Sequence, residues 1–462
     1  MRPFPAAVCW WSKSPPFLLL LLGRTPWSSC SSSSSSSSSS AAWYSQSTSL
    51  PRKLQRVRDH SFDGIMDVEK KSRVGLALRS LLLSHGGPSA SLPVSRLDLL
   101  ARRQLSLPSL SAARFLLRHP HAFHLFLHPV RRLLFARPSP RSLSQLALES
   151  RALSALLPSA PLRLRRLLLL SSPLRRLRLD HLRLLRRDLA LPDDFEQSVI
   201  LAHPSLFRLA VSPDADSPRS KYVEFLPHDS DPPDLAVPAV HRAREREYRA
   251  ARGAGAEEDA RFAFPIRFPP GFKIGKFFRI AVWKWQRLPY WSPYEDVSGY
   301  DLRSLEARRR MEKRAVATIH ELLSLTVEKR TTLERIAQFR QAMGLPKKLK
   351  EFLLQHQGIF YVSTRGNQGQ LHTVFLREAY WKGELVEPNE LYLARRKFDE
   401  LLLMSPQKAN LERMLTSMGR EWREVSGNGS GSSSGGAVSG DFRDDEDEGS
   451  GSDSGVESQY ID

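Results

Sequence analysis

Cysteine is almost absent from this 462-residue chain. The two that occur, Cys9 and Cys30, both lie near the N-terminus. If that stretch is removed, the remaining chain has no thiol. Disulfide cross-links, cysteine-ligated zinc and thiol catalysis are then excluded together.

Acidic residues are missing from the first fifty positions, and the first to occur is Asp59. The same stretch contains Arg2, Lys13 and Arg24, and serine occupies every position from 31 to 40. A segment that is poor in acids, contains arginine and is rich in serine is typical of an organellar transit peptide. We therefore interpret residues 1–50 as a disordered targeting segment. Its arginines favour the mitochondrion, with the chloroplast as the alternative.

Long apolar runs are also missing. The best candidate, Phe17–Leu22, is far shorter than the ~20 apolar residues that a membrane-spanning helix needs. A second run, Leu167–Leu170, is bordered by arginines on both sides, which argues against a span. The sequence therefore predicts no membrane partner.

Catalytic motifs are absent in the same way. The chain has no HExxH, no GxSxG, no phosphate-binding glycine loop and no dinucleotide fingerprint. Asp193, Asp194 and Glu196 resemble a carboxylate cluster, but acids are common in the first turn of a helix. Four histidines crowd together without any cysteine nearby, namely His119, His121, His124 and His128. We predict no enzyme activity, no metal, no cofactor and no small-molecule substrate.

Positive charge is what the chain has in excess. It contains 69 Lys and Arg against 49 Asp and Glu, a formal net charge of +20. Such a balance favours a polyanionic partner, most simply a nucleic acid. The exception is the glycine- and serine-rich segment 425–462, which contains an unbroken acidic run at Asp444–Glu448. We predict that this tail is disordered.

One short pattern is written three times. A Leu-Pro pair precedes an apolar helical segment, a histidine follows, and an aromatic residue stands four positions after that histidine. The copies run from Leu107 through His119 to Phe123, from Leu191 through His203 to Phe207, and from Leu345 through His356 to Phe360.

Each copy is followed by two β-rich runs that suggest a hairpin. The order helix, turn, helix and hairpin is that of a winged helix. We therefore predict an α+β fold, mostly helical, built from repeated winged-helix-like units at about 92–137, 174–227 and 331–377.

The strongest candidate binding patch interleaves cations with aromatic side chains. Single-stranded nucleic acids are bound by cations that follow the phosphates and by rings that stack on bases. The alternative is that the rings are core residues, which we favour for Trp283 and Trp285 taken one by one. The predicted patch consists of Lys273, Lys276, Arg279, Trp283, Lys284, Trp285, Arg287 and Tyr290.

Two further basic stretches are candidates. In a Leu/Arg-rich segment we expect leucines to face inward and arginines outward, toward phosphates. The last Leu-Pro helix and its hairpin loop contribute cations where a winged helix usually touches nucleic acid. The residues concerned are Arg165, Arg166, Arg175, Arg176 and Arg186 in the first stretch, and Lys347, Lys348, Lys350 and Arg365 in the second.

Several longer stretches resemble one known family. They include LPDDFEQSVILAHPSLFRL, GFKIGKFFRIAVWKWQRLPYWSPYED and TVFLREAYWKGELVE. These resemble the plant organelle RNA recognition (PORR) family, in particular its root primordium defective and "what's this factor" members. The resemblance implies an RNA-binding domain over about 51–410. It also implies a plant organellar protein that binds single-stranded or structured intron RNA and supports group II intron splicing alongside other splicing factors. A winged-helix-like DNA-binding protein or a scaffold of organelle nucleoids or splicing complexes is the alternative.

Overall fold

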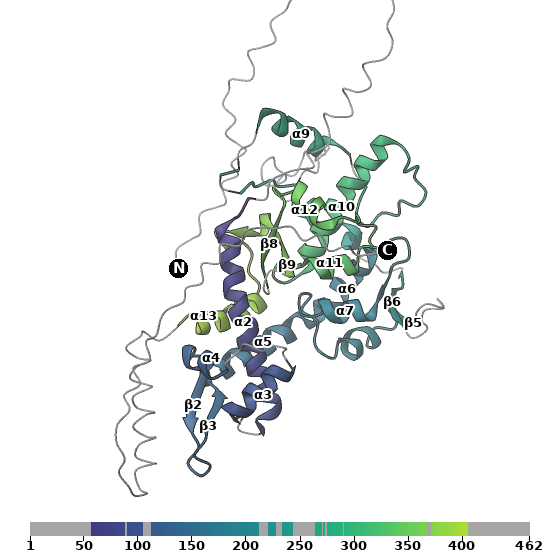
Figure 1. The fold of residues 1–462 in the computed structure, drawn as a ribbon. Coiled ribbons are helices and arrows are strands. Elements are labelled where there is room, and N and C mark those ends of the chain that lie inside the picture. The colour runs from purple at the N-terminus through teal and green to yellow at the C-terminus, as the bar shows by residue number, and fades with distance from the viewer. Residues whose placement is uncertain are drawn as a thin grey trace, which may run out of the picture.

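The computed structural model describes residues 57–87, 90–104, 112–211, 220–227, 233–243, 264–269, 271–272, 275–289, 291–366 and 371–404. The predicted targeting segment, the predicted acidic tail and the first Leu-Pro pair lie outside these residues. The described chain combines helices with small antiparallel sheets, and the predicted α+β class is therefore confirmed (Figure 1).

The first sheet lies in the N-terminal third of the described chain. Its strands are antiparallel and are arranged in the order β1-β3-β2. The elements in chain order are α2 (His60–His85), β1 (Leu92–Pro93), α3 (Val94–Gln104), α4 (Ala112–Arg118), β2 (Phe123–Leu127) and β3 (Leu134–Pro138).

The second sheet repeats this order. Two connecting elements, α5 (Pro140–Leu156) and η3 (Leu157–Ser159), lead into it. Its strands follow the order β4-β6-β5, again antiparallel. The elements are α6 (Ala160–Leu169), β4 (Arg176–Arg178), α7 (Leu179–Leu185), the π-helix η4 (Glu196–Leu201), β5 (Phe207–Val211) and β6 (Lys221–Phe225).

The third sheet has the same order once more, β7-β9-β8. Its elements are α10 (Leu305–Leu325), β7 (Arg330–Thr332), α11 (Leu333–Gln338), α12 (Leu349–Gln355), β8 (Phe360–Gly366) and β9 (Leu371–Leu376). We call the three sets of elements the first, second and third units. Each unit begins with a leading helix and a short first strand, and the short first strand was not predicted from the sequence.

Elements outside the units complete the described chain. They are η5 (Pro233–Ala236), α9 (Lys276–Arg287), η7 (Arg377–Ala379), β10 (Tyr380–Trp381), β11 (Glu384–Leu385) and α13 (Glu390–Leu403). Strands β10 and β11 pair with each other in a separate two-stranded sheet.

The repeated histidine ends its helix in the same way in every unit. The backbone carbonyl of His119 accepts a hydrogen bond from the amide of Phe123 at 3.1 Å. The carbonyls of His203 and His356 accept from the corresponding aromatic residues at 3.1 and 3.0 Å. One local turn therefore leads from the helix into the second strand of each sheet, which explains the constant spacing in the sequence.

The leucine of the Leu-Pro pair also has a fixed role. The amide of Leu191 donates to the carbonyl of Arg186, and that of Leu345 to the carbonyl of Arg340, both at 2.9 Å. This is the 6→1 bond that closes a helix when the residue before the leucine is left-handed. That residue is Ala190 in the second unit, with φ 52°, and Gly344 in the third, with φ 62°.

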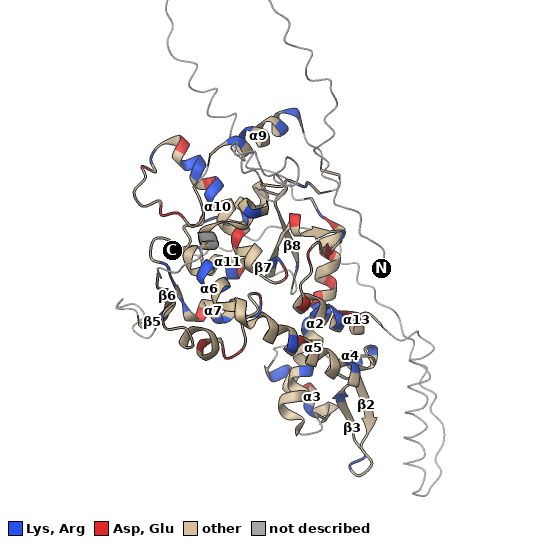
Figure 2. Ribbon diagram, turned by 180° about the vertical axis from the view of Figure 1, so that it is seen from behind, with Lys and Arg blue, Asp and Glu red and all other residues tan. Residues whose placement is uncertain are grey.

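The second and third units share one large core, which runs from Leu164 and Val199 to Leu322 and Phe352. The first unit has its own core, to which α13 contributes Phe398 and Leu402. Helix α2 connects the first unit to the third, because it packs on both α3 and β8. In Figures 1 and 2 the first unit projects from one end of the molecule, while α9 lies at the other end.

None of the helices in the described ranges is both long enough and apolar enough to cross a membrane.

Candidate nucleic-acid interface

Helix α9 carries cations and aromatic side chains without a single acid. Its sequence is KFFRIAVWKWQR, and it begins after Gly275, which provides no side-chain cap. Residues at positions 276, 277, 279, 280, 283, 284 and 287 are exposed, whereas Ala281 and Trp285 are buried. At about 100° per residue, the exposed positions fall on one side of the helix and the buried ones on the other. The helix therefore presents a continuous basic and aromatic face to solvent.

The inner face of α9 is anchored by Trp285, which is 2% exposed. Its ring lies 5.9 Å from that of Phe264 and 4.9 Å from that of His356, the histidine that ends α12. The side chain of Gln286 donates to the carbonyl of Phe264 at 2.7 Å and accepts from its amide at 3.0 Å. Helix α9 is thus held against the third unit beside α12 (Figure 1).

A buried cation from α10 closes the C-terminal end of α9. Lys313 is fully buried, and its Nζ donates to the carbonyls of Gln286 and Leu288, both at 2.6 Å. Its Nζ also lies 5.5 Å from the centre of the Trp285 ring. Burial lowers the pKa of Lys313 to about 8. A positive charge at a helix C-terminus opposes the negative end of the helix dipole and satisfies its last carbonyls.

The outer face of α9 combines two large exposed rings with cations. Phe277 is 86% exposed and Trp283 is 49% exposed. The guanidinium of Arg287 lies 3.7 Å from the centre of the Trp283 ring. Within the described chain, no carboxylate forms an ion pair with Lys276, Arg279, Lys284 or Arg287, and Figure 2 shows basic residues at both ends of the helix. The predicted residues Lys273 and Tyr290 lie outside the described residues.

Trp283 and Trp285 occupy opposite sides of α9. The prediction that Trp285 stacks on nucleic acid is wrong, because α10 and α12 cover its ring. The alternative interpretation, a core tryptophan, is right for Trp285, whereas Trp283 is exposed. A helical wheel of residues 276–287 places the two tryptophans on opposite sides of the helix. The exposure of Phe277, the most exposed ring on α9, comes from the tertiary structure.

The arginines of the second unit do not form the outward-facing row that the sequence predicted. Arg165 is 7% exposed, and its guanidinium lies 5.3 Å from the centre of the Phe225 ring. Helix α6 packs against β6, η4 and α10, so little of its surface remains open. The outward orientation expected for Arg165 is therefore wrong. Arg166 and Arg175 are half-buried, as is Arg176, which lies 5.2 Å from the Tyr222 ring.

Carboxylates from later elements offset part of this arginine charge. Arg186 forms an ion pair with Asp193 at 2.8 Å, and Arg183 pairs with Glu196 at 2.7 Å. These acids belong to the segment that resembled a carboxylate cluster in the sequence. No group of three or more His, Cys, Asp or Glu side chains in the described part of the chain could hold a metal ion.

The cations predicted on α12 and its hairpin differ in their surroundings. Lys347, Lys348 and Lys350 are exposed, and the Nζ of Lys348 lies 3.5 Å from Glu351. Arg365 is different because it forms an ion pair with Asp67 on α2 at 2.7 Å, and a second acid of α2 lies 3.7 Å away. Two acids of α2 therefore compensate the charge of Arg365, and its guanidinium links β8 to α2.

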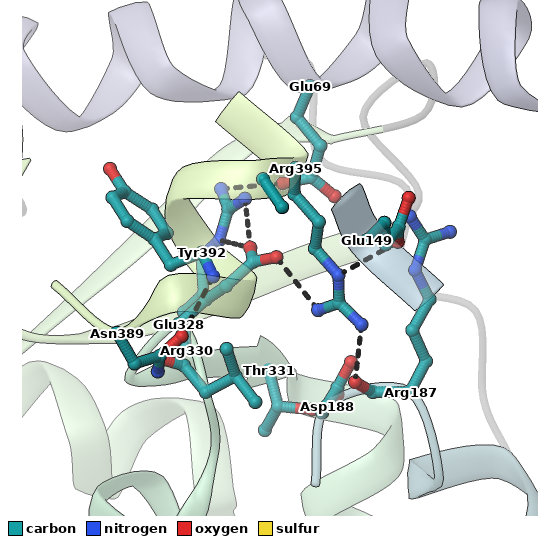
Figure 3. A network of polar contacts seen from close by, with 12 residues as sticks. Glu69, Glu149, Arg187, Asp188, Glu328, Arg330, Thr331, Asn389, Tyr392 and Arg395 are labelled. Atoms are coloured by element: carbon teal, nitrogen blue, oxygen red, sulfur yellow. Dashed lines mark hydrogen bonds and ion pairs between the residues drawn. The ribbon is translucent and has the colours of Figure 1, made fainter. Parts of the chain in front are cut away.

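The other dense group of charges is a buried network between α2, α5, α13 and the segment before β7 (Figure 3). The carboxylate of Glu328 accepts from Arg330 Nε at 2.9 Å and from Arg395 at 3.2 Å. Arg330 also pairs with Glu69 at 2.7 Å, and Arg395 with Glu149 at 3.3 Å. Burial by itself would raise the pKa of Glu328, but the two guanidinium groups hold it at about 2. The matched charges make this network a structural joint between distant segments.

The chain was compared with known proteins. The family model described as "Plant organelle RNA recognition domain" matches residues 57–407. Protein ROOT PRIMORDIUM DEFECTIVE 1 of Arabidopsis thaliana is 57% identical over 370 residues, which cover 80% of this chain and 88% of the relative. Protein WHAT'S THIS FACTOR 1, chloroplastic, of Zea mays is 33% identical over 362 residues, covering 76% and 67%.

A more distant relative is Protein WHAT'S THIS FACTOR 9, mitochondrial, of Arabidopsis thaliana. It is 27% identical over 351 residues, which cover 75% of this chain and 84% of the relative. No solved structure matches the chain.

Proposed function

The chain belongs to the plant organelle RNA recognition family, and from this premise we propose that it binds organellar intron RNA and promotes group II intron splicing without catalysis of its own. The observation that carries the proposal is the exposed face of α9. Its four exposed cations can neutralise phosphates, and the exposed rings of Phe277 and Trp283 offer flat surfaces for bases. Stacking of this kind is worth about 1–3 kcal/mol per base.

We further propose that the three units are winged-helix-like modules. The support is their common element order, with a short first strand next to the third and the third next to the second. In such modules the second helix and the hairpin loop usually meet nucleic acid. The exposed lysines Lys347, Lys348 and Lys350 lie in or just before that helix of the third unit.

The proposed mechanism is electrostatic. A group II intron carries its own catalytic centre, but its folded form brings phosphates close together. A protein face that neutralises phosphates and stacks unpaired bases stabilises that folded form. We propose the mitochondrion as the site of action, from the arginine-bearing and acid-free N-terminal segment. The names of the relatives include both organelles, so the chloroplast is the alternative.

The direct test is the salt dependence of RNA binding. The triple change Lys276→Gln, Arg279→Gln and Lys284→Gln removes three exposed cations from α9. If each contacts one phosphate of a single strand, the slope of log K against log salt falls by about 2 in magnitude, at roughly 0.7 per phosphate. The matched control changes Lys70, Lys71 and Lys397 to Gln, which removes the same charge from exposed positions on α2 and α13. Equal slopes for the two triple variants would refute the α9 interface.

Two experiments separate this function from its alternatives. Competition between single-stranded RNA and duplex DNA distinguishes an RNA-binding protein from a nucleoid DNA-binding protein. Sequencing of the RNA that co-purifies with the protein from isolated organelles identifies the transcripts. Absence of intron sequences from that RNA would contradict the splicing role, and absence of RNA binding by the wild-type chain would favour a scaffold.

A further inference from the structure

The first unit has an extreme charge balance that α9 does not explain. Residues 90–141 contain nine arginines and a single acid, Asp98. All nine arginines are exposed. The carboxylate of Asp98 is engaged locally, because it accepts from the amide of Ala112 at 2.6 Å. Segment 90–141, which contains all three strands of the first unit, therefore has an excess of positive charge that Asp98 does not offset.

The hairpin of β2 and β3 has an inner and an outer face. Along each strand successive side chains point to opposite faces, and the register pairs His124 with Arg137 and Phe126 with Phe135. The intervening residues, such as Phe123 and Ala136, belong to the core of the first unit. The outer face consequently carries rings and an arginine where a solvent-facing strand usually carries ordinary polar residues.

Contacts on this outer face order the rings. His124 stacks on Phe126 with a centroid distance of 5.9 Å, and the guanidinium of Arg137 lies 5.2 Å from the Phe126 centroid. His128 lies 4.8 Å from the buried Phe135. His124 is exposed and Phe126 is half-buried, so part of each ring is accessible to solvent.

The loop that joins β2 to β3 extends this surface. The Nδ1 of His128 accepts from the amides of Val130 and Arg131, at 3.3 and 3.2 Å, which fixes the turn. Val130 is 84% exposed, and Arg131 and Arg132 are exposed beside it. In the described part of the chain, no carboxylate forms an ion pair with Arg131, Arg132 or Arg137.

We propose that the outer face of the β2–β3 hairpin, with its loop, is a second binding surface for single-stranded RNA. This inference rests on the proposed RNA-binding function and adds a site to it. The hairpin lies at the end of the molecule opposite α9 in both ribbon views (Figures 1 and 2). The two surfaces hold two separate unpaired segments of one transcript, and the protein between them fixes their separation.

The chemistry of the surface favours a single strand over a duplex or a protein. Open rings on a flat sheet face stack on unpaired bases, which a duplex keeps inside its own stack. The cations stand around the rings, where the phosphates of a stacked strand run. An acidic protein segment would use the arginines but leave the rings of His124 and Phe126 without a specific role.

The test counts binding sites on the full chain. The probe is an oligouridylate of about ten nucleotides, short enough to occupy one site. The hairpin variant carries Phe126→Ala, Arg131→Gln, Arg132→Gln and Arg137→Gln, and the α9 variant carries Trp283→Ala with the three changes described above. Titration calorimetry is expected to give two oligonucleotides per wild-type chain, one for each variant and none for the combination. Circular dichroism confirms that each variant keeps its fold.

A second measurement uses an RNA with two unpaired segments joined by a spacer. Occupying both surfaces raises the affinity by about 10²–10⁴ over a single segment, and either variant loses that gain. Phe126→Ala by itself lowers the affinity of the hairpin site by roughly 5- to 150-fold, the equivalent of about 1–3 kcal/mol.

The outcomes distinguish this inference from the proposed function. If calorimetry gives one site on the wild type, and this site is lost in the α9 variant but kept in the hairpin variant, the second surface is refuted. The proposed function is then unaffected. Absence of RNA binding by the wild type overturns both. A hairpin surface that binds duplex RNA or an acidic peptide but no oligouridylate overturns the assignment to single strands.

Discussion

Replacing Glu328 by Gln tests how much the buried ion-pair network contributes to stability. The glutamate accepts from Arg330 and Arg395, and 20% of its side chain is exposed. The variant keeps the shape of the side chain and removes its charge. Arg330 then retains Glu69, and Arg395 retains Glu149, as carboxylate partners.

The magnitude follows from the pKa of Glu328. The folded structure lowers that pKa from 4.5 to about 2, against the opposing effect of burial. At 1.36 kcal/mol per pKa unit, the charged form is stabilised by about 3 kcal/mol. Removing one partner of a buried ion pair costs about 3–5 kcal/mol in other proteins, which agrees. We expect the free energy of unfolding at pH 7 to fall by about 3 kcal/mol.

The same pKa fixes the pH dependence. A glutamate with a lowered folded pKa contributes stability that is complete above about 4.5 and is lost as the pH falls toward about 2. Urea unfolding at pH 7 and pH 3 measures both effects, and the variant is expected to lose less stability than the wild type over that interval. The control is Glu384→Gln, an exposed glutamate that pairs with Arg396. A loss below about 0.5 kcal/mol for Glu328→Gln, equal to that typical of exposed pairs, would refute the reasoning.

Three further predictions concern other buried groups. Burial raises the pKa of Asp399 to about 6, so the carboxylate destabilises the fold as the pH rises through that value. Asp399→Asn is therefore expected to stabilise the protein by up to about 3 kcal/mol at pH 8 and not at pH 4. A gain independent of pH in thermal melts would contradict this. Lys313→Met leaves two carbonyls at the end of α9 without their donor. Amide hydrogen exchange in residues 276–287 is expected to become about tenfold faster. Unchanged protection from exchange would show that the cation does not stabilise the helix. Gly358→Ala places a methyl group 2.4 Å from Ile266 Cγ2 and is expected to lower the free energy of unfolding in urea by about 1–3 kcal/mol. The control is Gly64→Ala, which has open space around it and is expected to be neutral or stabilising.

The turn chemistry of the repeat was readable from the sequence. The spacing from His119 to Phe123 recurs because a hydrogen bond across one turn links the histidine carbonyl to the aromatic amide. Such bonds join residues a few positions apart, so their signal lies within a short window. The short strands β1, β4 and β7 left no comparable signal. Each has only two or three residues and acquires its partner from a hairpin far along the chain.

Two tryptophans show where local reasoning about the candidate site reached its limit. Trp283 and Trp285 lie two positions apart in a basic helix, and composition alone does not show which of the two rings is exposed. The rings of Phe264 and His356 lie against Trp285, and both are outside α9, with His356 far along the chain. Composition therefore identified the helix, and packing decided which of its rings is available for stacking.

The sequence by itself determined the large excess of positive charge, the confinement of both cysteines to the N-terminal segment, and the threefold occurrence of one local pattern. These properties depend on residue counts and short-range spacing. Only the tertiary structure decided which positive charges are uncompensated, because Arg365 meets Asp67 and Arg395 meets Glu328 across long sequence separations. Charge is a property of the composition, but its compensation depends on which distant carboxylate the fold brings within about 4 Å.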